Sequence, residues 1–133
     1  MKLVTRDTDY ALRALCFIAG HKGKIVSVSE LVSESKIPRP FLRKILQALN
    51  REKILKSYKG QGGGFSLALP VNKIFLLDLM KIFQGPLKLN ECFFKKKVFP
   101  NIKICRLRKK ISNIEKYLLS QLENFNISDL LKS

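Results

Sequence analysis

The spacing of apolar and polar positions in the N-terminal part of the chain predicts a series of short helices. Residues 9–20 are apolar on nearly every side, which is typical of a largely buried helix, and Gly20 and Gly23 should end it. Cys16 lies inside this stretch between Leu15 and Phe17. We therefore expect Cys16 to be a core residue, since free cysteine is among the most buried residue types.

The second helix has a clear start in the sequence. Ser27 and Glu30 are spaced as in a capping box, in which each side chain accepts a hydrogen bond from the other residue's backbone. The helix should therefore run from about Val28 to Ser35. Ile37 and Pro38 follow it, and the residue before a proline disfavours the helical conformation.

The third helix should begin at Arg39 or Pro40, because proline suits the first turn of a helix. Its apolar face consists of Phe41, Leu42, Ile45, Leu46 and Leu49. Its outward face carries Arg39, Arg43, Lys44 and Gln47. Two short helices joined by a tight turn match a DNA-binding helix-turn-helix.

A hairpin is predicted after the third helix. Residues 54–58 and 65–69 have the composition of strands, and the run at 60–64 between them is almost entirely glycine. A hairpin tip without side chains lets the backbone come close to a second surface. The sequence thus predicts a winged helix-turn-helix that binds DNA.

Further helices are expected at 74–84 and at 106–124. The predicted fold is mainly α with a small β-hairpin, a winged helix-turn-helix followed by a long C-terminal dimerisation helix. We expect a DNA-binding domain over residues 1–72, and a sensor loop with dimerisation helices over residues 73–133.

The last long helix has a continuous apolar seam, whose positions recur every three or four residues. The seam consists of Leu107, Ile111, Ile114, Leu118, Leu122 and Phe125. A stripe of this length is unusual on the surface of a stable monomer. It predicts a homodimer, whose two-fold axis would match a palindromic DNA site.

Charge supports a polyanionic partner. The 133-residue chain has a net charge of +16 and a pI near 10.1, while 46% hydrophobic residues indicate a folded protein. Eight Lys or Arg lie between Lys36 and Lys59 against the single acid Glu52, and eight more lie between Lys95 and Lys110 with no acid. The first cluster coincides with the predicted reading helix and wing.

Other classes of protein have little support. The chain has one histidine, no recognisable pair of catalytic carboxylates and no phosphate-binding loop motif, so we expect no enzyme and no catalytic residue. No signal peptide and no apolar run of membrane-spanning length is visible. The three cysteines suggest thiols in the reducing cytosol, which predicts a cytoplasmic protein without a membrane partner.

Several motifs, in this order, resemble the Rrf-type winged-helix regulators, the family typified by IscR, NsrR and CymR. The motifs are Thr8–Arg13, Ile37–Leu49, Gly60–Phe65, Cys105–Arg108 and the closing Asn126–Leu131. The resemblance covers nearly the whole chain. It implies a homodimer on double-stranded DNA, with each third helix in a major groove and each wing in a flanking minor groove.

The resemblance also assigns residues. Pro40, Arg43 and Lys44 match the base-reading face, although Pro40 has no hydrogen to donate, and Lys59 matches the basic residue of the wing. Arg43 and Lys44 fit the O6 and N7 atoms of guanine. The full set expected at DNA is Arg39, Pro40, Arg43, Lys44, Gln47, Tyr58, Lys59, Gly60, Gln61, Gly62 and Gly63.

A sensor is implied by the same resemblance. Iron–sulfur members carry three cysteines before the long helix, and Cys92 and Cys105 match the outer two. The middle position has no cysteine, and Arg108 stands where IscR-like members have histidine. Asp9 matches the acidic ligand that NsrR-like members take from the first helix of the partner subunit. Cys92, Cys105 and Asp9 would make three of the four ligands that a [2Fe-2S] or [4Fe-4S] cluster normally needs.

Alternatives stay open for these residues. Cys92 and Cys105 could form a redox pair favoured by the surrounding lysines, or be inert remnants of a fuller site. Asp9 could simply support the first turn of its helix, and Arg13 could pair with Asp9 or with DNA.

The function predicted is a regulator, most simply a repressor, that responds to iron–sulfur state, nitric oxide or redox state. The alternatives are a cofactor-free regulator controlled by a protein partner, and a basic protein that coats nucleic acid without sequence preference.

Overall fold

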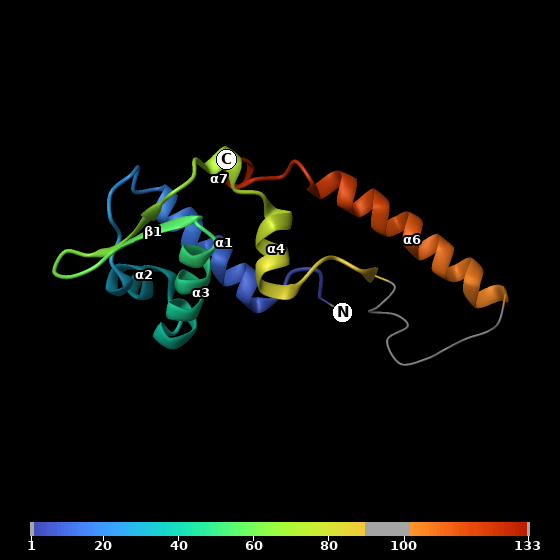
Figure 1. The fold of residues 1–133 in the computed structure, drawn as a ribbon, viewed down its shortest axis with the longest axis horizontal. Coiled ribbons are helices and arrows are strands. Elements are labelled where there is room, and N and C mark those ends of the chain that lie inside the picture. The colour runs from blue at the N-terminus through green and yellow to red at the C-terminus, as the bar shows by residue number, and fades with distance from the viewer. Residues whose placement is uncertain (1, 90–101, 133) are drawn as a thin grey trace.

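The computed structural model describes residues 2–89 and 102–132 (Figure 1). These residues form a mainly helical fold with a two-stranded antiparallel sheet, a winged helix-turn-helix followed by a long C-terminal helix, as the sequence predicts. Helices α1, α2, α3 and α4 and the hairpin pack together on one side, and α6 runs past them on the other (Figure 1). The boundary expected after residue 72 stays a prediction.

Helix α1 spans Arg6–Ala19 and begins three residues before the predicted start. The Thr5 side chain caps it by accepting a hydrogen bond from the Thr8 backbone N–H. Its buried positions recur every three or four residues and comprise Thr8, Ala11, Ala14, Leu15 and Ile18. Among the residues of α1 only Arg6 and Arg13 are exposed, so the helix is largely buried, as predicted.

Cys16, expected inside the core, lies at its edge. Cys16 is only partly buried and packs against the edge of the core, whereas its neighbour Leu15 is fully buried. Because successive residues differ by about 100° around a helix, Cys16 lies at the border of the face that Leu15 covers. Burial is still sufficient to raise the pKa of the Cys16 thiol above its ordinary value.

Helix α2 spans Val28–Ser35 with the predicted capping box. The Glu30 backbone N–H donates to Ser27 Oγ over 3.1 Å, and the Ser27 backbone N–H donates to Glu30 Oε1 over 3.5 Å. This box fixes the first turn of the helix that precedes the turn into α3.

Helix α3 spans Arg39–Arg51 with proline in its first turn, as predicted. Phe41 was expected on the apolar face but is 37% exposed. The core instead takes Leu42, Ile45, Leu46 and Leu49. Phe41 stays outside because it lies next to Arg6 of α1, whose guanidinium carbon is 4.5 Å from the centroid of the phenyl ring.

The wing is the hairpin formed by β1, Leu55–Tyr58, and β2, Gly64–Leu67. Its register pairs Leu55 with Leu67 and Tyr58 with Gly64, so each strand is slightly shorter than predicted. Val26 adds a one-residue bridge to the outer side of β2. Its N–H and C=O exchange hydrogen bonds of 2.8 Å with Phe65, which ties the wing to the segment before α2.

The glycines of the wing are required by the hairpin itself. Gly60 and Gly62 have φ angles of +87° and +78°, in the left-handed region that favours glycine. Gly63 and Gly64 have no room for a side chain, since a Cβ would lie 2.3 Å from the Tyr58 carbonyl oxygen or 2.2 Å from that of Val26. The glycine run therefore needs no bound partner to explain it.

The C-terminal part of the chain packs against the same hydrophobic core as the N-terminal helices. A 3₁₀ turn, η1, spans Val71–Lys73, and α4 spans Leu76–Gln84 rather than the predicted 74–84. The backbone at 74–76 is hydrogen-bonded to the backbone at 125–127 over 2.9 Å at each of two contacts. A short helix, α7, then spans Ile127–Leu131, where no helix was expected.

A polar cluster joins the start of α1 to the end of α4. Gln84 Oε1 accepts hydrogen bonds from the Thr5 N–H at 3.1 Å, the Thr5 hydroxyl at 3.2 Å and the Thr8 hydroxyl at 2.7 Å. Its amide nitrogen donates to the Leu3 carbonyl over 2.8 Å. Thr8 is fully buried, so Gln84 supplies the acceptor that its hydroxyl needs.

Helix α6 spans Ile102–Leu122 and begins four residues before the predicted start. The expected apolar seam is divided by the fold. Ile111 is buried against the rest of this chain, Leu107 and Ile114 are 46% and 48% exposed, and Leu118, Leu122 and Phe125 are partly buried. Tyr117, which the sequence analysis did not include, is 67% exposed.

Candidate nucleic-acid interface

The outward face of α3 carries the predicted reading residues. Arg39, Pro40, Arg43, Lys44 and Gln47 are all exposed, on the side opposite the buried leucines and isoleucine. No acidic residue lies in the first turn of this helix. A row of cations and one amide on a rigid helix is suited to contact both phosphates and base edges.

Arg39 is held by α2. One terminal nitrogen of its guanidinium donates to the Ser29 hydroxyl over 3.3 Å. This contact links the start of α3 to the start of α2, so the two helices of the helix-turn-helix present their N-terminal turns together.

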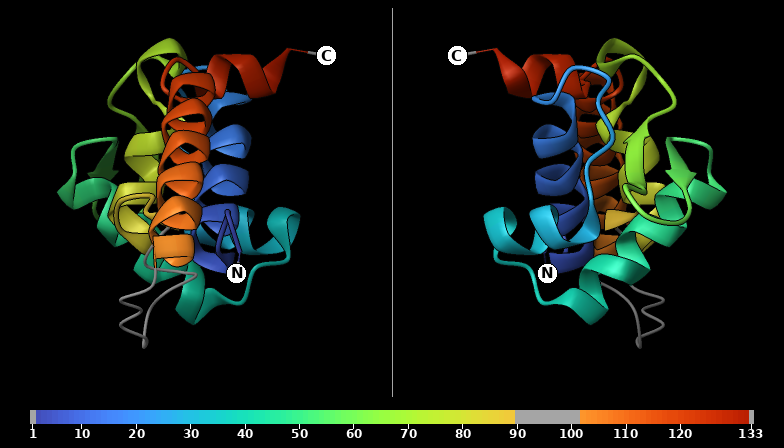
Figure 2. Two further views of the ribbon diagram at one scale, coloured as in Figure 1. Left: turned by 90° about the vertical axis from the view of Figure 1, so that its right-hand side faces the viewer. Right: turned by 90° about the vertical axis from the view of Figure 1, so that its left-hand side faces the viewer.

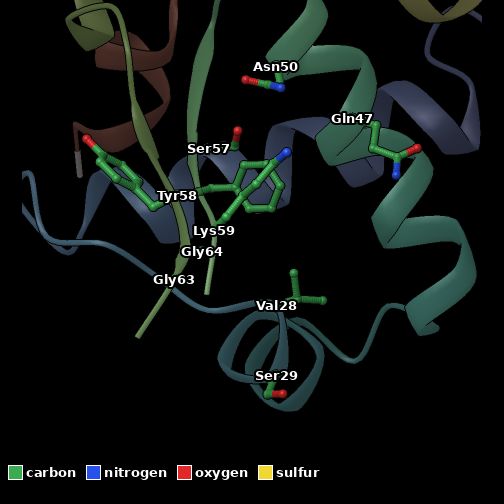
Figure 3. Close-up of a pocket in the computed structure, with 10 residues that line it drawn as sticks. Val28, Ser29, Gln47, Asn50, Ser57, Tyr58, Lys59, Gly63 and Gly64 are labelled. Atoms are coloured by element: carbon green, nitrogen blue, oxygen red, sulfur yellow. The ribbon is translucent and has the colours of Figure 1, made fainter. Parts of the chain in front are cut away.

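A groove of about 410 Å³ separates α3 from the wing (Figure 3). Figure 3 shows α3 on one side of this α3–wing groove, the hairpin on the other and α2 across one end. It is lined by Val28, Ser29, Gln47, Asn50, Ser57, Tyr58, Lys59, Gly63, Gly64 and Phe65. Its polar lining combines hydroxyl, amide and ammonium groups, all of which can donate to phosphate oxygens.

The structure brings some of the predicted residues together in this groove. Gln47, Tyr58, Lys59 and Gly63 all line it, while Arg39, Arg43 and Lys44 lie along the exposed face of α3. Gly60, Gln61 and Gly62 form the exposed tip of the wing. The predicted set therefore forms one surface, which extends from α3 across the groove to the wing.

Three polar residues of the groove were not predicted from the sequence, namely Ser29, Asn50 and Ser57. Asn50 had a signal, because it follows Arg43 by seven residues and so lies on the same face of α3. Ser29 and Ser57 come from α2 and β1, and only the packing of those elements places them here.

Tyr58 has interactions of its own at the end of β1, next to the tip of the wing. Its hydroxyl lies 3.4 Å from the hydroxyl of Ser66, and the Lys56 ammonium lies 5.7 Å from the centroid of its ring. The ring is 37% exposed, so it presents an aromatic surface beside two lysines, Lys56 and Lys59.

Of the three predicted cluster ligands, only Asp9 has a side chain among the described residues. Asp9 is bound by Arg13, whose terminal nitrogen lies 2.7 Å from a carboxylate oxygen, which favours the first of the two partners considered for Arg13. Cys92 lies outside the described residues, and so does the side chain of Cys105, whose backbone belongs to α6. Within residues 2–89 and 102–132, no group of three or more potential ligands comes together.

This fold and this exposed basic helix define a winged helix-turn-helix protein of the DNA-binding regulator class. The family model Rrf2, described as an iron-dependent transcriptional regulator, matches residues 4–133. The chain therefore belongs to the Rrf2 family of transcriptional regulators, which are not enzymes. The resemblance noted from the sequence motifs is confirmed.

Known proteins are similar to this chain in sequence or in fold. Over 91 residues the chain is 40% identical to a protein of Aquifex aeolicus (strain VF5) described as an HTH-type transcriptional regulator, and the match covers 68% of the chain and 63% of that relative. The fold is similar to that of CymR, the global cysteine regulator of B. subtilis, with a TM-score of 0.78 and 18% identity over 98% of this chain and 96% of that one. It is also similar to that of T. potens IscR, with a TM-score of 0.68 and 21% identity over 98% and 86% of the two chains.

Membrane insertion has no support in the described helices. Helix α6 is the longest of them at 21 residues, and neither it nor any other described helix is apolar enough to cross a bilayer.

Proposed function

We propose that this chain acts as a homodimer that binds a palindromic DNA site and represses transcription by occluding a promoter. Helix α3 enters the major groove, and Arg43 and Lys44 read guanine there. The wing reaches the flanking minor groove, with Lys59 on the phosphate backbone. The observation that carries this proposal is the exposed cationic face of α3 beside a basic wing.

The α3–wing groove supports this arrangement. A strand of DNA backbone separates a major groove from its neighbouring minor groove, so a protein that enters both must leave room for that strand between its two contacts. The groove lies between α3 and the wing and is lined by Asn50, Ser57 and Lys59, which suit phosphate oxygens.

The dimer is supported by α6. Leu107, Ile114 and Tyr117 are large apolar or aromatic residues, each at least 46% exposed on this one helix. Exposed apolar stripes of this kind mark interaction surfaces, and a second copy of α6 offers a matching stripe by two-fold symmetry.

Light scattering would test the dimer. Ile114→Lys should shift the protein from dimer to monomer, because it places a charge in the stripe while leaving the core of each subunit intact. Asn113→Lys adds the same charge at the neighbouring exposed position and should leave the dimer unchanged. A monomeric wild-type protein would contradict the proposal.

Base reading would be tested by competition binding. Arg43→Ala should relax the preference at one base position of each half-site. The contact that it removes discriminates against the wrong base by about 1–3 kcal/mol. Lys59→Ala should weaken binding to operator and random DNA by similar factors, because phosphate contacts carry no sequence information. Equal losses on both DNAs for Arg43→Ala would favour a protein that coats nucleic acid without sequence preference.

The signal stays a prediction. Iron–sulfur, nitric oxide or redox control would each act through Cys92 and Cys105. An absorption spectrum with iron and sulfide assays on protein purified without oxygen would separate control by a bound cluster from control without a cofactor. Stoichiometric iron and sulfide would support a cluster, and an iron-free protein that binds a palindrome would favour a thiol pair or a regulatory protein partner.

A further inference from the structure

We propose that Arg6, at the start of α1, is a further DNA-contacting residue that binds a phosphate, and that Phe41 of α3 positions it. This inference rests on the proposed function, since it extends the same DNA surface from α3 to α1. It assigns a role to a contact between two elements that lie far apart in the sequence.

Position is the first argument. The N-terminal ends of α1 and α3 lie at the same end of the molecule in both views of Figure 2. The Arg6 guanidinium carbon is 4.5 Å from the centroid of the Phe41 ring and 5.9 Å from that of Tyr10. Phe41 directly follows Pro40 in the first turn of α3, so Arg6 lies beside the turn that enters the DNA.

The exposure of Phe41 is the second argument. A phenyl ring that is 37% exposed in the middle of a cationic surface has no role in the core, which the other apolar residues of α3 fill. An aromatic face holds a guanidinium in a fixed plane, and a planar guanidinium can bind a phosphate through two parallel N–H groups. Phe41 therefore provides a platform that directs Arg6.

Arg13 shows what distinguishes Arg6. Both arginines lie against Tyr10, Arg13 with its guanidinium carbon 5.7 Å from the ring centroid. Arg13 also forms an ion pair of 2.7 Å with Asp9 through a terminal nitrogen. Arg6 approaches Asp7 only at 3.7 Å and through Nε, the inner nitrogen of the guanidinium. The side chains of Arg6 and Arg13 are 57% and 55% exposed, so the difference between them lies in the closer ion pair of Arg13 and not in accessibility.

The salt dependence of DNA binding tests the phosphate contact. Each phosphate neutralised on duplex DNA adds about 0.9 to the steepness of log K against log salt. Arg6→Gln should reduce that slope by about 0.9 per subunit, on operator and on random DNA alike. Arg13→Gln removes the same charge seven residues further along the same helix and should leave the slope unchanged. Thermal unfolding of each variant should match the wild type.

Phe41→Leu tests the positioning role, because leucine keeps an apolar side chain but has no aromatic face. Binding should weaken by about two- to fivefold, the usual size of an exposed cation–π contact. In the Arg6→Gln background the same change should have no effect, since the residue that it positions is gone.

Two outcomes would overturn this inference and leave the proposed function intact. One is a wild-type slope for Arg6→Gln in a protein whose operator preference still depends on Arg43. The other is an equal fall in slope for Arg6→Gln and Arg13→Gln, which would show a general charge effect. A protein whose operator preference is also unaffected by Arg43→Ala would instead contradict the proposed function itself.

Discussion

Gly64→Ala should detach the wing from the body of the protein. An alanine Cβ at this position would lie 2.2 Å from the carbonyl oxygen of Val26 and 2.7 Å from its carbonyl carbon. Both are backbone atoms, so no side-chain rotation relieves the overlap. The segment at Val26 must move away, and its two hydrogen bonds of 2.8 Å with Phe65 are then lost.

The magnitude follows from these contacts. Two backbone hydrogen bonds contribute about 2 kcal/mol together, at about 1 kcal/mol each. The φ angle of +154° at Gly64 adds backbone strain of about 1–3 kcal/mol for any other residue. We therefore expect the free energy of unfolding to fall by about 3–5 kcal/mol, a large share of the roughly 5–15 kcal/mol typical of a domain.

Urea denaturation would measure this change, with Gly62→Ala as the matched control. Gly62 lies in the same hairpin with a φ of +78°, but a Cβ there meets nothing within 4 Å. The left-handed conformation is then the only cost of alanine at this position, and it should lower the free energy of unfolding by about 1–2 kcal/mol. If Gly64→Ala costs no more than Gly62→Ala, the close approach of Gly64 to Val26 is not what requires glycine.

Two further substitutions and one chemical probe test the body of the protein. Gln84→Ala should lower the free energy of unfolding by about 1–3 kcal/mol, because it removes the acceptor of the buried Thr8 hydroxyl. Gln47→Ala, on the exposed face of α3, should change the free energy of unfolding by less than about 0.5 kcal/mol. Thermal unfolding would measure both variants, and equal effects of the two substitutions would contradict the role of the polar cluster around Gln84. Because burial raises the pKa of the Cys16 thiol above its ordinary value, iodoacetamide should alkylate Cys16 at pH 8 more slowly in the folded than in the urea-unfolded chain, as read by peptide mass spectrometry. The same raised pKa has no effect on stability well below the ordinary pKa of a thiol, and it destabilises the fold as the pH rises through that range, because the unfolded thiol then ionises first. Equal alkylation rates in the folded and unfolded chains would contradict the protection of Cys16 by burial.

Elements with a local signal were predictable from the sequence. The capping box of Ser27 and Glu30 placed the start of α2, and proline placed the start of α3. The outward residues of α3 were also predictable, because helical spacing alone separates Arg43 and Lys44 from the buried Leu42 and Ile45.

Elements that depend on distant partners were not predictable. Ile74 and Phe75 have the apolar character of the helix that follows them, yet their backbone pairs with the segment at 125–127. That pairing also brings Ile127 into the first core, where it is fully buried. Helix α7 did have a local signal, since Asn126 and Asp129 form a capping box like that of α2, but the helix has only five residues.

The same distinction applies to the proposed DNA-binding surface. The α3 and wing residues follow from motif and spacing, whereas Arg6 and Ser29 reach this surface only because α1 and α2 pack beside α3. Phe41 shows the limit of periodicity. Its spacing matches the apolar face, but a neighbouring guanidinium from another helix gives it a partner outside the core.

Selection of bound sequences from a random DNA library, with wild-type protein and Arg43→Ala in parallel, tests the central claim most directly. The wild type should enrich a palindrome with two half-sites about one helical turn apart, as expected for a dimer that places two α3 helices in successive major grooves. Arg43→Ala should enrich the same palindrome with one base position relaxed in each half-site. A library that shows no palindrome, or an identical motif for both proteins, would contradict the assignment of α3 as the reading helix.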